Sequence, residues 1–271
     1  MWPTIMFDSL LWACYTTIMI KQKAVISLFD LTGVMVEPWV EGGYQCFIFD
    51  MQHPDVSIEE QLEQEANPIQ VTGLSDEWYE PLHEIFNHYD VQILFSFPPC
   101  TDLAVSGAAH FARKYEADHL YRDKAMQLVY MAYGLANAYD VPVMIENPVS
   151  VISTEWRKPD YSFHPYEYGG YLPVDDESPY ELIPNRDCYT KKTCLWTSGN
   201  FVMPEAMPVA LPSSYTYSPQ HLKLGGKSLK TKNIRSATPR GFARAVYTAN
   251  SDTWEVPKMS VIEWPIKESD L

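Results

Sequence analysis

The sequence predicts an α/β fold built on a doubly wound, mostly parallel sheet. Over the first 150 residues, short apolar stretches typical of strands alternate with segments of helical spacing. One of these stretches, residues 91–97, is almost wholly apolar, which is typical of a strand buried on both faces of a parallel sheet. Repeated alternation of this kind favours parallel strands joined by helices.

The expected elements follow one another in a regular order. Strands are expected at residues 24–29, 45–50, 67–74, 91–97 and 141–146. Helices are expected at residues 36–44 and 76–89, and where apolar positions 125, 128, 129, 132, 135 and 136 share one helix face. A last helix is expected at residues 238–250, with Thr238 as its N-cap and Pro239 at its first position.

The chain divides into four expected regions. Residues 1–22 form an uncertain N-terminal extension, and residues 23–150 form the α/β core. Residues 151–235 form a small irregular region, because the stretch 158–180 is dense in Pro, Gly, Tyr and acidic residues without helical or strand periodicity. Residues 236–271 hold the final helix, which returns to the core, and a tail.

Composition indicates an ordered globular protein. The chain has 271 residues, of which 46% are hydrophobic and 20% charged. The longest apolar run, between Ile5 and Ile20, is interrupted by Asp8, so we expect no membrane span and place the protein in the cytoplasm. The five cysteines form no CxxC pair, which argues against a disulfide framework or a metal site.

Charge is distributed very unevenly. The segment from Arg186 to Arg244 holds ten basic and two acidic residues, a balance of +8, whereas the whole chain carries −15 and the remainder therefore −23. A basic segment on an acidic body suits contact with nucleic acid through one face. A basic face that is merely solvated is the alternative.

In a doubly wound sheet, ligands bind beyond the carboxyl ends of the strands. After the first strand comes a turn with Gly33, and after the second comes Asp50, an acidic residue placed to accept hydrogen bonds from ribose hydroxyls. The turn lacks a full GxGxxG pattern. Together the two features suggest a cofactor that carries adenosine.

Two further loops carry candidate catalytic groups. Cys100 follows two prolines directly after the apolar strand at residues 91–97, which favours an exposed and fixed thiol over an inert buried one. Glu146 and Asn147 end the strand at residues 141–146 and so lie at the same edge of the sheet. A purely structural role for Glu146, capping a neighbouring loop, stays open.

The order of these motifs resembles the C5-cytosine DNA methyltransferases, and most of all their short, divergent, phage-type members. FPPCTDLAVSG is similar to the family's Pro-Cys loop, and IENP is similar to its Glu-Asn-Val motif. Leu31 stands where the family has its first glycine, and Pro148 replaces valine. The family's Gln-x-Arg-x-Arg motif is absent, and residues 190–193 are the nearest basic candidate.

The resemblance implies the fold of class I S-adenosylmethionine-dependent methyltransferases and methyl transfer to C5 of cytosine in double-stranded DNA. Cys100 would add to C6 of a flipped base, Glu146 would donate a proton toward N3, and Asn147 would orient the loop or the base. The implied cofactor is S-adenosyl-L-methionine. Its implied contacts are Phe29, Leu31, Gly33, Asp50, Asp76 and Pro98, although Phe29 could equally be ordinary core.

DNA phosphates would be met by basic side chains in or near the irregular target-recognition region. These are Lys191, Lys192, Arg235 and Arg240, with Arg157 and Lys158 as second choices. Two other functions remain open: the same chemistry on RNA or a pyrimidine nucleotide, and a catalytically inactive binding or decoy protein whose acidic surface imitates nucleic acid. The sequence fixes neither the target site nor the oligomeric state.

Overall fold

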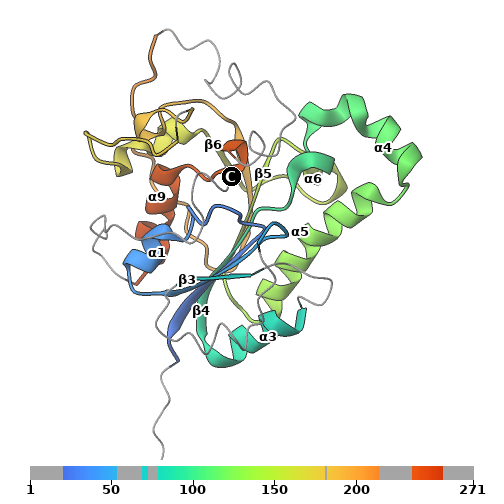
Figure 1. Ribbon diagram of the computed structural model, residues 1–271, viewed down its shortest axis with the longest axis horizontal. Coiled ribbons are helices and arrows are strands. Elements are labelled where there is room, and N and C mark those ends of the chain that lie inside the picture. Colours follow the sequence, from blue (N-terminus) through green and yellow to red (C-terminus); the bar gives the residue numbers. More distant parts are fainter. Residues whose placement is uncertain (1–20, 54–68, 73–78, 181, 214–233, 253–271) are drawn as a thin grey trace, which may run out of the picture.

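The computed structural model describes residues 21–53, 69–72, 79–180, 182–213 and 234–252. Within these residues, one seven-stranded sheet runs through the molecule with helices on both faces (Figure 1). The strand order is β3-β2-β1-β4-β5-β7-β6, so the chain winds outward from β1 in one direction and then from β4 in the other. The predicted fold class, a doubly wound and mostly parallel α/β sheet, is confirmed.

The parallel part of the sheet has five strands. They are β1 (Lys23–Leu28), β2 (Gln45–Phe49), β3 (Ile69–Thr72), β4 (Asp90–Ser96) and β5 (Val143–Pro148). β4 shows why such strands read as continuous apolar runs, because Ile93 and Phe95 pack into the core on one face while Leu94 packs into the core on the other.

Two strands come from the region for which the sequence predicts irregular structure. β7 (Thr193–Ser198) pairs antiparallel with β5, and β6 (Tyr161–Phe163) pairs antiparallel with β7. β6 is too short to show a period of two, and the basic residues before β7 mask its apolar character. Because β7 runs against β5, its first residue lies at the carboxyl edge of the parallel strands, where Thr193 is opposite Pro148.

Helices cover both faces of the sheet (Figure 1). α3 (Tyr79–His88) and α5 (Tyr121–Ala138) pack on one face, and α1 (Glu37–Glu41) and α9 (Arg240–Asn250) pack on the other. The remaining helices are α4 (Phe111–Ala117), α6 (Ile152–Glu155), and the short 3-10 turns η1 (Cys100–Asp102), η2 (Val105–His110), η3 (Pro165–Tyr171) and η4 (Asn185–Asp187). None of the helices described has the length and apolarity to cross a membrane.

α9 begins one residue later than the sequence predicts. Pro239 occupies the N-cap position rather than the first helical turn, and no side chain caps the helix. Gly241 lets this end of α9 approach η3 closely, since a Cβ atom at that position would lie 2.4 Å from the carbonyl oxygen of Tyr168. The helix therefore packs directly against the 158–180 segment and anchors it to the sheet.

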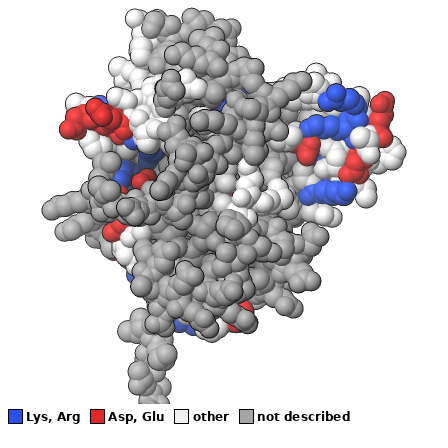
Figure 2. Space-filling view, viewed as in Figure 1, with Lys and Arg blue, Asp and Glu red and all other residues white. Residues whose placement is uncertain are grey.

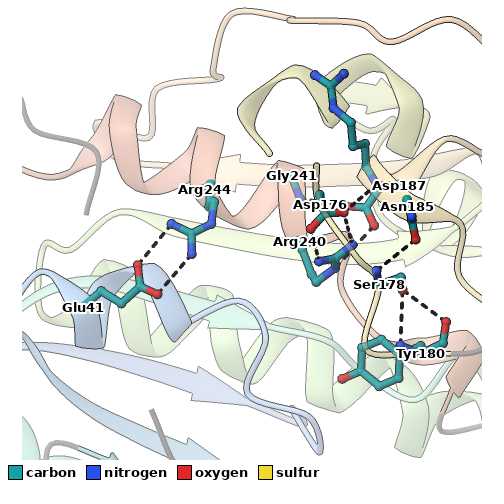
Figure 3. A network of polar contacts seen from close by, with 10 residues as sticks. Glu41, Asp176, Ser178, Tyr180, Asn185, Asp187, Arg240, Gly241 and Arg244 are labelled. Carbon is teal, nitrogen blue, oxygen red and sulfur yellow. Dashed lines mark hydrogen bonds and ion pairs between the residues drawn. The ribbon is translucent and has the colours of Figure 1, made fainter. Parts of the chain in front are cut away.

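Buried ion pairs hold α9 to its neighbours (Figure 3). Arg240 donates two hydrogen bonds to Asp176, at 2.6 and 2.7 Å, and Arg244 donates two to Glu41 of α1, both at 3.1 Å. Asp187 accepts a hydrogen bond of 2.7 Å from the backbone N–H of Gly241. These contacts join residues far apart in the sequence and fix the 176–187 segment against the first turn of α9.

The buried Asp187 should make stability depend on pH. Burial raises its pKa from 3.8 to about 6, against the opposing effects of Arg240 and the Gly241 N–H. The folded protein therefore holds this proton more tightly than the unfolded chain, and the stabilising effect is lost as pH rises through the window between the two values. We expect up to about 3 kcal/mol of unfolding free energy to disappear between about pH 4 and pH 6.

Asp187→Asn should lack this dependence while keeping an oxygen that can accept from Gly241. Urea unfolding of both proteins at several pH values measures the difference. Asp175→Asn changes an exposed acid directly before Asp176. It is the control and should behave like the unchanged protein. Parallel pH curves for the protein and Asp187→Asn would contradict this account.

Candidate active site

The carboxyl ends of four parallel strands bring the predicted site residues to one edge of the sheet. The register places Leu28 of β1 beside both Phe49 of β2 and Ser96 of β4, and Ser96 beside Ile145 of β5. The turn at 29–33, Asp50, the loop with Cys100, and Glu146 with Asn147 each follow or end one of these strands. This edge is where ligands bind in doubly wound folds.

Cys100 lies at the start of the turn η1, directly after Pro98 and Pro99. It is a free cysteine and is exposed. Its carbonyl oxygen accepts hydrogen bonds from the N–H groups of Leu103, at 3.1 Å, and Ala104, at 2.8 Å, which close the turn behind it. The two prolines and this closed turn fix the backbone on both sides of the thiol.

The Cys100 loop is tied to the end of β5. The side-chain amide of Asn147, which is 1% exposed, donates a hydrogen bond of 2.8 Å to the carbonyl oxygen of Pro98. Farther along, Val105 donates from its N–H to the carbonyl oxygen of Val149, and Val151 donates to that of Leu103, at 3.0 and 2.9 Å. The loops that carry Cys100 and Glu146 therefore form one connected unit.

The helix α4 also contacts the Cys100 loop. The ammonium group of Lys114, on α4, donates hydrogen bonds of 2.6 Å to the carbonyl oxygen of Thr101 and to the carboxylate of Asp102. Asn147 thus holds the residue two positions before Cys100, and Lys114 holds the two residues after it.

Glu146 presents a half-buried carboxyl group beside this loop. Its Oε1 atom is buried and has no hydrogen-bond partner within the described residues. Burial raises the pKa of the carboxyl group, and the nearby charge of Lys191 partly opposes that rise. A carboxyl group in this condition holds a proton more readily than an exposed one, and so can donate it.

The Cys100 thiol belongs to the same electrostatic group. Although the residue as a whole is exposed, protein atoms surround much of its sulfur. The pKa of the thiol is raised overall, because this burial and the negative charge of Glu146 outweigh the opposing charges of Lys191 and Arg235. Lys191 reaches this edge because it lies two residues before β7, whose first residue is opposite Pro148. Its ammonium group donates a hydrogen bond of 3.0 Å to the carbonyl oxygen of Arg235, which brings the two basic residues together.

The turn after β1 is held by a side chain that the sequence prediction overlooked. Asp30, 4% exposed, accepts hydrogen bonds from the N–H of Gly33 at 2.8 Å, from the N–H of Thr32 at 3.2 Å, and from the Ser27 hydroxyl at 2.7 Å. Phe29 and Gly33 both have left-handed backbone conformations, with φ of 58° and 67°. The carboxylate holds the turn in this shape without the usual row of glycines.

The cofactor contacts predicted from the sequence, at this turn and on other loops, lie in different surroundings. Phe29 is 5% exposed and packs into the hydrophobic core between the sheet and the helices α3 and α5. Leu31 is half-buried, and its carbonyl oxygen lies 3.1 Å from the Nε2 atom of His53. Asp76 lies outside the described residues, and the Pro98 carbonyl is already bonded to Asn147.

Asp50 and His53 lie at the end of β2, next to this turn. Asp50 is half-buried, and burial raises the pKa of its carboxyl group. His53 is 8% exposed, and its Nδ1 atom has no hydrogen-bond partner in the part of the chain that is described. Because a carbonyl oxygen only accepts, the contact with Leu31 places the proton of a neutral ring on Nε2 and leaves Nδ1 as an acceptor. No motif in the sequence pointed to His53.

The basic residues expected to contact phosphates differ in availability. Lys192 and Arg235 are exposed, and Lys191 is half-buried at the edge of the site. Arg157 is held by Asp160 through two hydrogen bonds of 2.7 Å and stacks over Trp156.

The structure contradicts the role predicted for Arg240 as a phosphate contact. It is 8% exposed and committed to the buried ion pair with Asp176, so it is not placed to meet phosphate. On the face shown in Figure 2, charges of both signs gather over the projecting helix α4. The visible face of α4 therefore carries both basic and acidic side chains and is not a purely basic surface. Across the residues described, no group of three or more His, Cys, Asp or Glu side chains is arranged to hold a metal ion.

Comparison with family models and with curated proteins finds no match to this chain. Among solved structures, the chain is similar to an E. coli protein described as a "putative DNA modification methyltransferase encoded within prophage". The identity is 12% and the TM-score 0.40, over 70% of this chain and 52% of the other. The chain thus spans about half the length of that protein, and a likeness this weak carries no argument about chemistry.

The opposing charges around Cys100 predict opposite effects of two substitutions. Glu146→Gln removes a negative neighbour and should lower the pKa of the thiol, so that alkylation by iodoacetamide at about pH 8 becomes severalfold faster. Lys191→Gln removes a positive neighbour and should slow the same reaction.

Mass spectrometry of the Cys100 peptide over a range of pH measures both effects. The partly exposed Cys188 serves as an internal reference, whose rate should not change. A shift in the same direction for both variants would show that the thiol does not sense these charges.

Proposed function

We propose that this protein is an S-adenosylmethionine-dependent methyltransferase that methylates C5 of cytosine in DNA through a covalent adduct with Cys100. One observation carries the proposal: a free cysteine at the surface and a carboxyl group with a raised pKa lie on loops that are hydrogen-bonded to each other at the ligand-binding edge of the sheet. The strand order, with one antiparallel strand beside β5, suits the methyltransferase-like α/β fold expected from the sequence.

The proposed chemistry needs a nucleophile because C5 of cytosine is too poor a nucleophile by itself. Addition of the Cys100 thiolate to C6 would make C5 electron-rich enough to attack the methyl carbon of a sulfonium, whose S–CH3 bond would break to leave a neutral thioether. A base such as solvent water would then take the C5 proton, and the electron pair of that C–H bond would restore the C5–C6 double bond and expel the thiolate. Burial and Glu146 raise the pKa of the Cys100 thiol overall, and Lys191 and Arg235 are the neighbours whose charges favour the thiolate form.

The acid must act as the thiolate adds, because negative charge then develops toward N3 of the base. Glu146 fits this task, since its buried Oε1 atom has no partner within the described residues and its raised pKa favours the protonated form. The Nδ2 atom of Asn147 is committed to Pro98, whereas its buried Oδ1 atom has no partner within the described residues. We therefore assign Asn147 to positioning the loop through Nδ2, and Oδ1 is the atom it has left for the base.

The proposed cofactor would supply the methyl group on a positively charged sulfur. The residues at the ends of β1 and β2 fit an adenosine group: Asp50 offers a carboxylate for ribose hydroxyls, and His53 offers an unpartnered ring nitrogen, within the described residues, beside it. Phe29 lies in the core, so we assign it to shaping the turn, and its predicted contact with adenine remains open.

A target cytosine inside a duplex must leave the stack to reach Cys100, at a cost of a few kcal/mol. Lys191, Lys192 and Arg235 are the proposed phosphate contacts that offset this cost. They lie at the rim of the site, and within the described residues none has a buried ion-pair partner such as Arg240 has. Double-stranded DNA is thus the proposed substrate, with RNA and a free pyrimidine nucleotide as tested alternatives.

A duplex that contains 5-fluorocytosine should trap the adduct. Fluorine at C5 blocks the proton loss that releases Cys100, so a covalent complex should accumulate with S-adenosylmethionine and appear on a denaturing gel. Cys100→Ala should give no complex, whereas Cys188→Ala should react normally. Single-stranded DNA and RNA carrying the same base separate the alternative substrates. An inactive decoy protein predicts no adduct with any of them.

Glu146→Gln should separate catalysis from cofactor binding. Losing the proton donor should lower turnover by about 100-fold or more, while the affinity for S-adenosylmethionine, measured by calorimetry, should change little because Asp50 and His53 are untouched. Asp50→Asn is the matched control and should weaken the affinity first. Equal losses of turnover and affinity in Glu146→Gln would mean that Glu146 supports the fold of the site and not the reaction.

A further inference from the structure

The turn after β1 uses its own backbone donors internally. In dinucleotide-binding folds, the free N–H groups of this turn and of the helix that follows hold phosphate groups. Here the N–H groups of Thr32 and Gly33 donate to the carboxylate of Asp30, and the N–H of Asp30 itself donates to the carbonyl oxygen of Phe49 at 3.1 Å. A phosphate at this place would find these donors occupied.

The helix that follows offers no replacement. α1 has only five residues and carries Glu37 in its first turn. Its N-cap residue, Val36, provides no side-chain hydrogen bond. Negative charge at the start of a helix cancels the weak attraction for anions that the backbone provides.

The side chains that surround the turn add negative charge. Asp30 is almost fully buried, which raises the pKa of its carboxyl group, and the charge of Asp50 acts in the same direction. The hydrogen bonds from Ser27 and Gly33 and the charge of His53 oppose this rise and favour the ionised form. A buried charge interacts more strongly with a ligand than an exposed one, because little solvent screens it. An anionic ligand would therefore be repelled here and a cationic one attracted.

An independent observation indicates that a ligand belongs beside these acids. His53, also almost fully buried, bridges the two loops through its contact with Leu31, yet its Nδ1 atom has no partner among the described residues. Buried polar atoms normally have partners, so an unpartnered acceptor here suggests a missing donor, such as a ribose hydroxyl.

We propose that Asp30 makes this site selective for an adenosine ligand that is positively charged at its 5′ position and against one that carries phosphate there. The inference rests on the proposed function and adds to it a residue that distinguishes cofactor from product: the sulfonium of S-adenosylmethionine is attracted by the Asp30 charge, whereas the neutral thioether of S-adenosylhomocysteine is not.

Calorimetric titration of the full-length protein tests this without any assay of activity. Asp30→Asn keeps an oxygen that can accept from Gly33 but removes the charge. It should lower the affinity for S-adenosylmethionine about fivefold relative to that for S-adenosylhomocysteine. Ser27→Ala keeps the carboxyl group but removes a hydrogen bond that favours its charged form. It should shift the ratio of affinities in the same direction as Asp30→Asn, but by less.

Ligand charge gives a second test that needs no variant. Three adenosine derivatives with a dimethylsulfonium group, a methylthio group or a phosphate at the 5′ position should bind the unchanged protein in that order. Equal binding of the phosphate and the sulfonium would overturn the proposal, as would an equal loss of both cofactor affinities in Asp30→Asn. Failure of the unchanged protein to bind either S-adenosylmethionine or S-adenosylhomocysteine would instead refute the proposed function.

Discussion

The hydrogen bond between the Asn147 amide and the Pro98 carbonyl is the contact on which the candidate site depends. It joins the ends of two neighbouring strands at the point where one carries a thiol and the other a carboxyl group. Without this contact the thiol and the carboxyl group would lie on two separate loops, and their relative position would not be fixed. The amide is buried, so competition from water is weak and the contact can hold the two loops together.

Burial of acidic groups is the common physical theme of this edge and of the region behind it. Asp30, Asp50, Glu146 and Asp187 all have raised pKa values, with burial as the largest cause in each case. The protein compensates these groups differently. Asp187 and Asp30 accept backbone hydrogen bonds, which stabilise their local structure. Glu146 keeps an unpartnered oxygen within the described chain, which is costly for stability and useful only if a ligand completes the contact.

The sequence predicted the frame of the sheet and the positions of the reactive loops because both depend on local signals. Apolar runs such as that of β4 mark buried strands, and a residue directly after such a strand must lie at the ligand-binding edge. Cys100 and Glu146 were found in this way. The role expected for Arg240 was wrong because its partner, Asp176, lies 64 residues earlier, and nothing in either local sequence announces the pair.

Other features were missed for similar reasons. The strand β7 was hidden because its apolar residues follow two lysines and a stretch without periodicity, so the segment was interpreted as a basic loop. Asp30 was passed over because an aspartate in a turn is common, and only the folded structure shows that its carboxylate accepts hydrogen bonds from the N–H groups of Thr32 and Gly33. Local sequence predicts the secondary structure of a segment, whereas the roles of β7 and Asp30 depend on their contacts with other parts of the chain.

The net charge of −15 is a weak objection to a polyanionic substrate. Screening in physiological salt limits the reach of exposed charges to about 8 Å, so a ligand at the rim responds mainly to the groups around it. There Lys191, Lys192 and Arg235 lie beside a carboxyl group whose pKa is raised and whose negative charge is therefore reduced. The cofactor side of the same edge holds two acidic groups, Asp30 and Asp50, whose pKa values burial also raises. There the hydrogen bonds that Asp30 accepts from Ser27 and Gly33 favour its charged form, whereas the buried Glu146 oxygen has no such partner within the described residues. A site built in this way would draw a phosphate backbone to one side and a sulfonium to the other, and it would keep the two charged ligands from exchanging places.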